Sequence, residues 1–292
     1  MNIRVFVTGV GGQLGYDVIL ELAKRGYECN GSDIVDKEKI KLPCEYRQLD
    51  ITDKYAVEKV IGEVRPDAVI HCSAYTAVDK AEDEQELCYL VNVVGTENIA
   101  KICKEIDAKM VYISTDYVFD GTKYGLYEVD DIPNPINVYG KTKLAGEKAV
   151  QKILEKYFIV RISWVFGING NNFIKTMLRL GKERSELNVV ADQVGSPTYT
   201  ADIAPLLVDM VQTEKYGIYH ATNEGECSWA EFAEEIFRLA GMDVRVNHIA
   251  TSEYPTKAKR PMNSRMGKEK LGDNKLPNWK NALYRFLSTS MK

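Results

Sequence analysis

Short apolar runs alternate with amphipathic stretches through the first 165 residues of this 292-residue chain, and this alternation constrains the fold more than any other feature. The apolar runs are rich in valine, isoleucine and aromatic residues, as buried strands are, and lie at 3–7, 27–33, 68–71, 109–114 and 158–163. The stretches between them predict helices near 13–25, 53–64, 85–106 and 138–156. Strands that alternate with helices favour an α/β fold with a doubly wound parallel sheet.

The rest of the chain has a less regular pattern. Its clearest helix is "SWAEFAEEIFRLAG", because Ser228 and Glu231 fit a capping box and Gly241 fits a C-terminal stop. We expect residues 1–165 to form one domain and residues 166–292 to form mainly a smaller α/β lobe, with a segment at about 200–220 returning to the first domain. The other expected elements are helices near 171–182, 201–213 and 279–287 and strands at 217–221 and 244–249.

Composition argues against several classes of partner and location. The net charge of −4 gives no reason to expect nucleic acid. No window approaches eighteen uninterrupted apolar residues, and "NIRVFVTG" opens the chain without a basic and then apolar leader, so we expect neither a membrane span nor a signal peptide. Six cysteines without a CxxC pair indicate a reduced, cytoplasmic protein, and the three separated histidines form no zinc pattern.

A glycine-rich turn joins the first strand to the first helix. In "VTGVGGQLG", Gly9, Gly12 and Gly15 follow the spacing G-x-x-G-x-x-G, and Gln13 and Leu14 open the helix. Glycine permits a tight turn and lets the backbone approach a pyrophosphate, which the free N–H groups of a helix N-terminus attract. A plain glycine-rich turn is the alternative, but the strand–helix setting favours dinucleotide binding by a Rossmann-type domain.

Polar and small residues follow the next strands where the rest of a dinucleotide would lie. Asp33 ends the second strand eighteen residues after Gly15, where an acidic side chain binds the adenosine ribose of NAD and repels a 2′-phosphate. Alternatively, Asp33 only caps its strand. Further cofactor contacts are expected from "LDIT", beside the adenine, and from the small residues after the third strand, namely Asp50, Ile51, Cys72, Ser73, Ala74 and Tyr75.

The stretch "NVYGKTKLAGEKA" offers a pair for proton transfer. Tyr139 and Lys143 are four residues apart and therefore share one helix face. A phenol titrates near about 10, and a neighbouring ammonium lowers that value, so the pair can act as acid or base. The spacing alone is a weak signal in a chain with seventeen tyrosines. Its place after the fourth apolar strand and behind the glycine turn favours the functional interpretation over an ordinary surface pair.

Together these motifs resemble the extended short-chain dehydrogenase/reductase superfamily and, within it, the dTDP-4-dehydrorhamnose reductase family. The similarity spans the chain and includes "TGVGGQLG", "TAVDKAE", "STDYVFDG", "NVYGKTKLAGEK", "RISWVFG", "GNNFIKTMLRLGKE", "DQVGSPT" and "KRPMNSR". It implies NADPH- or NADH-dependent reduction of the C4 ketone of dTDP-4-dehydro-L-rhamnose to dTDP-L-rhamnose, a nucleotide sugar for cell-surface polysaccharide. It also implies that Thr115 binds the C4 oxygen, Tyr139 protonates it, and Lys143 tunes Tyr139 and orients the nicotinamide ribose.

The resemblance further implies a dTDP-sugar site between the first domain and the smaller, substrate-binding lobe. The expected substrate contacts are Val78, Asp116, Tyr117, Val118, Trp164, Asn172, Lys175 and Arg260. Each basic residue would meet the diphosphate, although a charge cluster is usually solvated surface. In isolation Trp164, followed by Val165, would more often be a core residue, and Asn172 fits a helix N-cap equally well.

Departures from the family pattern bear on cofactors and assembly. Tyr75 stands where the family often has histidine near the nicotinamide. Some members bind magnesium at a dimer interface through glutamates. Here Asp17 occupies one such position, and "TYTADIA" does not match the second. We therefore name no metal ligands and regard Mg²⁺ binding as doubtful. Both a monomer and a homodimer are retained. The family accepts NADPH and often NADH, and Asp33 leans toward NADH, so both are retained.

Other functions of the same fold are the alternatives. A sugar-nucleotide 4,6-dehydratase typically has Asp-Glu after its catalytic threonine, whereas Thr115 is followed by Asp116 and Tyr117, which argues against elimination. Another nucleotide-sugar 4-ketoreductase, or an epimerase that retains its NAD, stays open. A non-catalytic regulatory subunit is a further alternative, because one eukaryotic relative regulates methionine adenosyltransferase, but the intact Thr115, Tyr139 and Lys143 argue against it.

Overall fold

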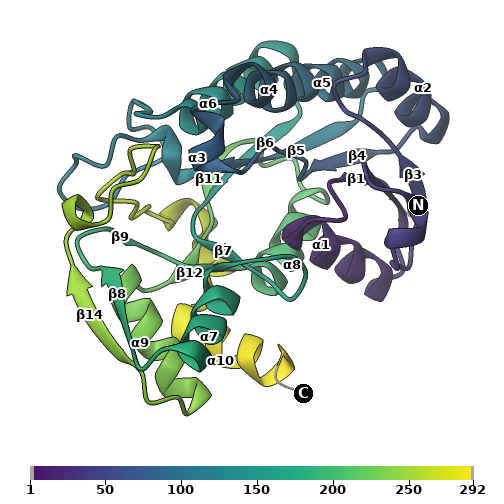
Figure 1. Ribbon diagram of the computed structural model, residues 1–292. Helices are drawn as coiled ribbons and strands as arrows, with labels where there is room; N and C mark the ends of the chain where they lie inside the picture. Colours follow the sequence, from purple (N-terminus) through teal and green to yellow (C-terminus); the bar gives the residue numbers. More distant parts are fainter. Residues whose placement is uncertain (1–2, 291–292) are drawn as a thin grey trace.

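A seven-stranded parallel sheet forms the centre of the larger part of the molecule (Figure 1). The computed structural model describes residues 3–290. The strand order is β11-β6-β5-β4-β1-β2-β3, and β1 pairs with β2 and β4 so that Thr8 lies opposite Ser32 and His71. This confirms the predicted doubly wound α/β fold. The strands are β1 (Arg4–Thr8), β2 (Glu28–Asp33), β3 (Glu45–Gln48), β4 (Ala68–His71), β5 (Lys109–Thr115), β6 (Tyr157–Ile162) and β11 (Gly217–His220).

Helices cover both faces of this sheet. One face packs against α1 (Gln13–Lys24) and α8 (Thr200–Met210). The other face packs against α2 (Lys54–Val64), α5 (Thr96–Glu105) and α6 (Val138–Ile153). The helix expected over 85–106 is divided into α4 (Gln85–Tyr89), a π-helical turn (Leu90–Gly95) and α5, preceded by the short α3 (Val78–Ala81). Wide turns of this kind often mark functional sites.

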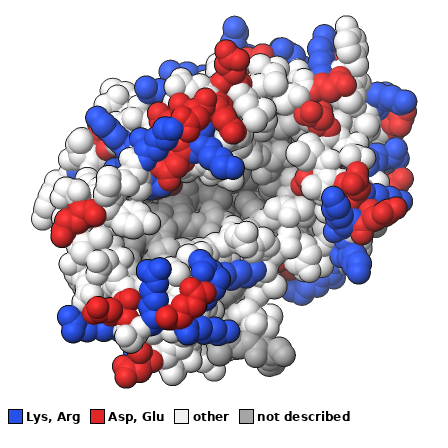
Figure 2. All heavy atoms as spheres, viewed as in Figure 1, with Lys and Arg blue, Asp and Glu red and all other residues white. Residues whose placement is uncertain are grey.

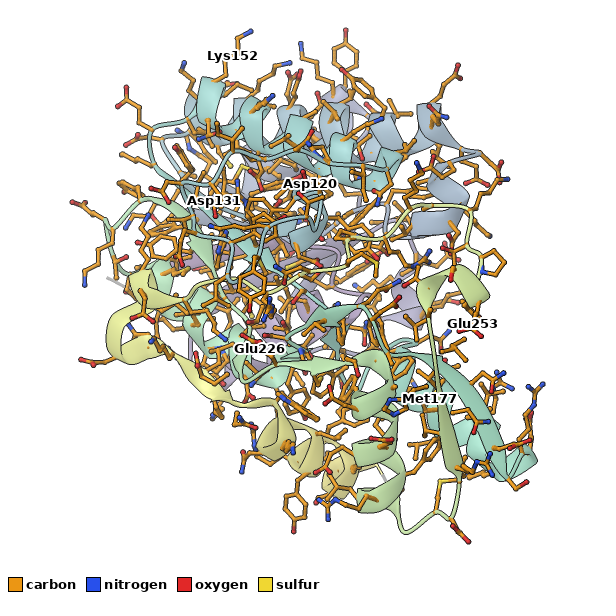
Figure 3. The ribbon with its side chains drawn as sticks, turned by 90° about the vertical axis from the view of Figure 1, so that its left-hand side faces the viewer. Asp120, Asp131, Lys152, Met177, Glu226 and Glu253 are labelled. Atoms are coloured by element: carbon orange, nitrogen blue, oxygen red, sulfur yellow. The ribbon has the colours of Figure 1, made fainter. Side chains whose placement is uncertain are left out.

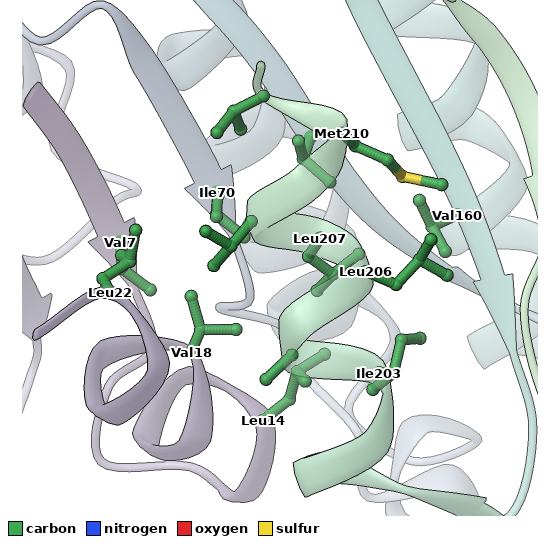
Figure 4. Close-up of a cluster of buried hydrophobic side chains, with 14 of the residues drawn as sticks. Val7, Leu14, Val18, Leu22, Ile70, Val160, Ile203, Leu206, Leu207 and Met210 are labelled. Atoms are coloured by element: carbon green, nitrogen blue, oxygen red, sulfur yellow. The ribbon is translucent and has the colours of Figure 1, made fainter. Parts of the chain in front are cut away.

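The α1–α8 face explains why a late segment returns to the first part of the chain. Val18 of α1 and Leu207 of α8 are fully buried in one apolar cluster with Val7 of β1 (Figure 4). Burial of side chains of this size contributes about 1.5–3 kcal/mol each. Helix α8 packs beside α1 on this face, and β11, which follows α8, lies at the sheet edge, where it pairs with β6.

The smaller lobe is built from helices and short strand pairs. Its helices are α7 (Phe173–Glu183), α9 (Trp229–Ala240) and α10 (Trp279–Ser290), and its longest strand pair is β8 (Glu186–Val190) with β14 (Arg245–Ile249). As predicted, Ser228 and Glu231 form a capping box at the start of α9, and Gly241 ends it in a left-handed conformation. In Figure 3, Lys152 of α6 lies at the top of the view, Met177 of α7 lies within the lower part, and Asp120 lies between them.

Short elements of both parts carried no sequence signal. The strand β3 reads "EYRQ", so only Tyr46 turns into the core and no apolar run announces it. The sequence pattern also did not predict the two-residue strands or the three-residue strand β15 (Leu276–Asn278). The two-residue strands are β7 (Val165–Phe166), β9 (Val194–Gly195), β10 (Thr198–Tyr199), β12 (Asn223–Glu224) and β13 (Cys227–Ser228). Within residues 3–290, no helix combines the length and apolar character needed to cross a membrane.

Candidate active site

A cavity of about 830 Å³ follows the carboxyl ends of the central strands, and Figure 2 shows a hollow rimmed by charges of both signs. Open α/β sheets bind ligands at this edge, where the strand order reverses on either side of β1. All the predicted cofactor residues lie on the cavity wall, namely Gly9, Gly12, Gln13, Leu14, Gly15, Asp33, Asp50, Ile51, Cys72, Ser73, Ala74, Tyr75, Tyr139 and Lys143.

The glycine turn leaves no room for side chains. Gly9 has a φ of +73°, and a Cβ there would lie 2.7 Å from the backbone nitrogen of Ser73. A Cβ on Gly15 would collide with the Gly9 carbonyl. Gly12 is the N-cap of α1 and brings no side chain to cover the first N–H groups of the helix. These residues therefore suit the pyrophosphate of a dinucleotide, which needs an open helix N-terminus.

Asp33 is anchored at the end of β2 by two backbone hydrogen bonds. Its Oδ2 accepts a hydrogen bond of 2.9 Å from the backbone N–H of Gly11, and its Oδ1 accepts one of 2.8 Å from Ile34. The carboxylate thereby ties the end of β2 to the glycine turn. It also lines the cavity, where it places negative charge beside the position expected for the adenosine ribose.

Helix α6 presents Tyr139 and Lys143 to the cavity. Its N-cap Asn137 accepts a hydrogen bond of 2.7 Å from the Gly140 N–H, which sets where the helix begins. The Lys143 Nζ donates to the Ile113 carbonyl at 2.7 Å. Burial lowers the pKa of Lys143 to about 7, and the Glu147 charge opposes that shift.

The pKa of Tyr139 differs from the expectation drawn from its spacing to Lys143. Burial raises the pKa of the phenol well above its ordinary value, with only the Thr115 hydroxyl opposing this change. The Lys143 ammonium instead lies 4.1 Å from the centre of the Tyr112 ring and bonds the Ile113 carbonyl. Burial is therefore the largest influence on the pKa of each of the two groups that share this helix face.

Four of the predicted substrate residues lie on the cavity wall, namely Val78, Asp116, Tyr117 and Trp164. Trp164 has a left-handed backbone, with φ of 49°, which is unusual for a bulky side chain. Its indole stacks on Trp229 with ring centres 3.6 Å apart. A strained residue at a cavity is typical of functional sites, where the surroundings hold it in place.

The other four predicted substrate residues do not line the cavity, although Asn172 donates to the side chain of the cavity residue Gln13 at 3.0 Å. Val118 is fully buried in an apolar cluster with Phe119 and Tyr127. Asn172 caps α7 by accepting a hydrogen bond of 3.1 Å from the backbone N–H of Lys175. The Lys175 ammonium donates to the Ile168 carbonyl at 2.6 Å, so it is bonded within a loop of the smaller lobe.

Arg260 is paired with an acidic residue across the molecule. Its Nη2 lies 2.6 Å from Asp79 Oδ2 and its Nη1 lies 3.1 Å from Asp79 Oδ1. The same carboxylate accepts a hydrogen bond from the backbone N–H of Ala258. Arg260 therefore joins α3 to the late segment that carries "KRPMNSR".

A buried ion pair lies behind the site, and no sequence motif predicted it. The Arg161 guanidinium bonds both oxygens of Glu147, at 2.9 and 2.8 Å, and Ser114 donates to the same carboxylate. Glu147 lies one turn after Lys143 on α6 and raises the Lys143 pKa. The signal in the sequence was Arg161 within the apolar run of β6, because a charge buried in a strand usually has a partner of opposite charge.

The position considered for magnesium serves packing. Asp17 of α1 is buried and accepts a hydrogen bond from the Thr200 hydroxyl of α8. Burial raises the pKa of Asp17, as expected for a carboxyl that joins two helices. Over residues 3–290, no group of three or more histidine, cysteine, aspartate or glutamate side chains is arranged to hold a metal ion.

The fold and the cavity define the class of protein. A Rossmann-type sheet with a glycine turn, and a threonine, tyrosine and lysine on one cavity, is the arrangement of the extended short-chain dehydrogenases/reductases. A family model described as the RmlD substrate binding domain matches residues 3–291. The dTDP-4-dehydrorhamnose reductase of Aggregatibacter actinomycetemcomitans is 43% identical over 274 residues, covering 89% of each chain. The chain belongs to the RmlD, or dTDP-4-dehydrorhamnose reductase, family.

Solved structures agree with this assignment. A dTDP-4-dehydrorhamnose reductase of Bacillus anthracis, in complex with NADP, is 45% identical and superposes with a TM-score of 0.91, covering 99% of this chain and 100% of that one. A dTDP-4-dehydrorhamnose reductase of Clostridium acetobutylicum is 40% identical with a TM-score of 0.92 and the same coverage. The likeness therefore extends over both the sheet and the smaller lobe.

Proposed function

We propose that this chain reduces the C4 ketone of dTDP-4-dehydro-L-rhamnose to dTDP-L-rhamnose with NADPH or NADH, as a step in nucleotide-sugar biosynthesis. The observation that carries the proposal is that the glycine turn and the residues Thr115, Tyr139 and Lys143 line one cavity. A cofactor bound along the glycine turn would bring its reactive ring toward these side chains. The names of the relatives supply the identity of the sugar nucleotide.

The residues of the cavity suit reduction of a ketone. The bound nicotinamide supplies the hydride. The developing alkoxide needs a proton, and the raised pKa of Tyr139 keeps its phenol protonated at neutral pH, so the phenol has a proton to give. Lys143 is held against the Ile113 carbonyl at the floor of the site, where it can orient a ribose hydroxyl. Positioned donors of this kind stabilise negative charge on the substrate oxygen.

Trp164 and Tyr117 complete the proposed sugar site. Tyr117 lies edge-on to Tyr139 with ring centres 5.6 Å apart, and Trp164 lies on the same cavity. Tyr117 occupies the position of the dehydratase glutamate, and its phenol is held neutral because burial raises its pKa. This environment supplies no second carboxylate at that position to eliminate water, which favours simple reduction.

The experiment is to supply dTDP-4-dehydro-L-rhamnose and to follow NADPH or NADH absorbance, with product identification. We expect oxidation of the cofactor and formation of dTDP-L-rhamnose. Tyr139→Phe should lower kcat by about 10²–10⁴-fold while cofactor affinity changes little. Tyr124→Phe is a matched control, because Tyr124 is fully exposed. Absence of oxidation with both cofactors would refute the proposal, and an epimerised product would indicate a different enzyme of the fold.

A further inference from the structure

A buried chain of hydrogen bonds joins the late segment of the protein to Thr115. Ser264 Oγ donates to Asp116 Oδ2 at 2.5 Å, and Thr115 Oγ1 donates to Asp116 Oδ1 at 2.9 Å. The exposed fractions of Ser264, Asp116 and Thr115 are 4%, 2% and 5%. Ser264 is held in place by its backbone N–H, which donates to the Val194 carbonyl at 2.8 Å. The carboxyl of Asp116 is thus bonded through both oxygens in a nearly dry setting.

The number of hydroxyl protons limits what Thr115 can do. A threonine hydroxyl has one proton to donate. In this structure Thr115 gives that proton to Asp116, while its oxygen accepts from the Tyr117 backbone N–H at 3.2 Å. An ionised Asp116 can only accept, so it holds the Thr115 proton. In this arrangement Thr115 has no proton left for a ketone oxygen in the cavity.

We propose that protonation of Asp116 reverses the Thr115 hydroxyl, so that Thr115 donates to the C4 oxygen, and that Ser264 is a positioning residue for this reversal. With a proton on Oδ1, Asp116 donates to Thr115 Oγ1, and the Thr115 proton turns toward the cavity. Ser264 occupies Oδ2 as a donor, which directs the Asp116 proton to Oδ1. The inference rests on the proposed function, because it concerns the donor to the substrate ketone.

The surroundings of Asp116 suit a carboxyl that changes its protonation near neutral pH. Burial raises the pKa of Asp116 to about 6, against the opposing effect of the Ser264 and Thr115 hydroxyls. Two phenols face it, Tyr117 from the 3₁₀ turn Asp116–Val118 and Tyr139 from α6, and burial raises the pKa of each, so both are neutral.

The cations near this group are engaged elsewhere. The Arg260 charge partly opposes the rise in the Tyr117 pKa, but the guanidinium is paired with Asp79. Arg265, the residue after Ser264, bonds Asn263 and lies 3.3 Å from Glu226. The protonation of Asp116 therefore depends mainly on burial and on the two hydroxyls that bond it.

The first test compares the pH dependence of kcat/KM for ketone reduction in the wild type and in Asp116→Asn. In the variant, the amide nitrogen can donate to Thr115 at every pH, while Ser264 donates to the amide oxygen. We expect the ratio of variant to wild-type kcat/KM to rise at least about 10-fold from about pH 5 to about pH 8, because only the wild type loses its donor. Because both proteins contain Lys143, the effect of its titration on kcat/KM cancels in the ratio.

Two further proteins separate this effect from a structural one. Ser264→Ala removes a donor that favours the ionised carboxylate, so the wild-type fall in kcat/KM should move to higher pH by about one unit. Asp120→Asn is the matched control from the same stretch, since hydrogen bonds hold the pKa of Asp120 at about 2 and it stays ionised throughout. Its profile should have the wild-type shape.

A direct titration keeps the inference testable if Asp116→Asn does not fold. With ¹³C-labelled aspartate, infrared difference spectra of the wild type should show a carboxylic-acid band that disappears between about pH 5 and about pH 7 and moves upward in Ser264→Ala. Failure of the wild type to reduce the ketone would refute the proposed function. An active enzyme whose ratio does not change with pH, or whose Asp116 is ionised at pH 5, would overturn only the inference.

Discussion

Replacing Glu147 by glutamine tests whether the buried ion pair behind the site is both structural and functional. The exposed fractions of the Glu147 and Arg161 side chains are 1% and 2%, so water cannot replace either partner. Glutamine keeps the shape of the side chain but places an N–H₂ group against one guanidinium nitrogen. Removing one partner of a buried pair costs about 3–5 kcal/mol, since the remaining charge stays buried. We expect the free energy of unfolding to fall by this amount.

The same substitution should change the chemistry of the site. The Glu147 charge raises the pKa of Lys143, which burial has brought down to about 7. Without that charge the pKa of Lys143 falls further, so the ammonium is lost at a lower pH. The decline of activity that accompanies Lys143 deprotonation should therefore begin at lower pH in Glu147→Gln than in the wild type.

Urea unfolding measured for a double-mutant cycle is the assay. Glu147→Met and Arg161→Met should each be costly, but the double variant should lose at least about 2 kcal/mol less than the sum, because no uncompensated charge remains. The control is Asp107→Asn, which breaks the exposed pair with Lys156 and should cost no more than about 1 kcal/mol. A loss below about 1 kcal/mol for Glu147→Gln, or additive single effects, would refute the reasoning.

Three further outcomes are expected. Gly9→Ala, which brings a Cβ to 2.7 Å from the Ser73 nitrogen, should weaken cofactor binding at least about 10-fold by titration, and unchanged affinity would contradict the tight turn. Asp33→Asn should raise the NADPH-to-NADH ratio of kcat/KM by about 10-fold, and an unaltered ratio would remove Asp33 from cofactor choice. Burial lowers the pKa of His71 and of His220 from 6.5 to about 3, so the stability they confer is complete above pH 6.5 and is lost as pH falls toward 3. Urea unfolding should show a loss of about 2 kcal/mol per histidine by about pH 5, and a smaller loss after either is replaced by asparagine.

Local patterns in the sequence predicted six of the seven sheet strands, and the predicted cofactor residues line one cavity. Apolar runs and amphipathic stretches report burial along one element, so the strands and helices of the first 165 residues were predicted to within a few residues. The glycine turn and Asp33 are defined by their distance from a strand end, and the doubly wound fold then brings strand ends together. Polar β3 and the π-helical turn Leu90–Gly95 departed from these patterns and were missed.

By itself, the sequence determined the doubly wound sheet, the glycine turn and the placing of Tyr139 and Lys143 on one helix face. Only the tertiary structure decided which charges are buried and what each side chain contacts. Arg161 pairs with Glu147, Arg260 pairs with Asp79, and Asp116 is bonded by Ser264, 148 residues further along the chain. The physical reason is that desolvation and hydrogen-bond partners depend on what packs over a residue, whereas periodicity records only which side of its own element is covered.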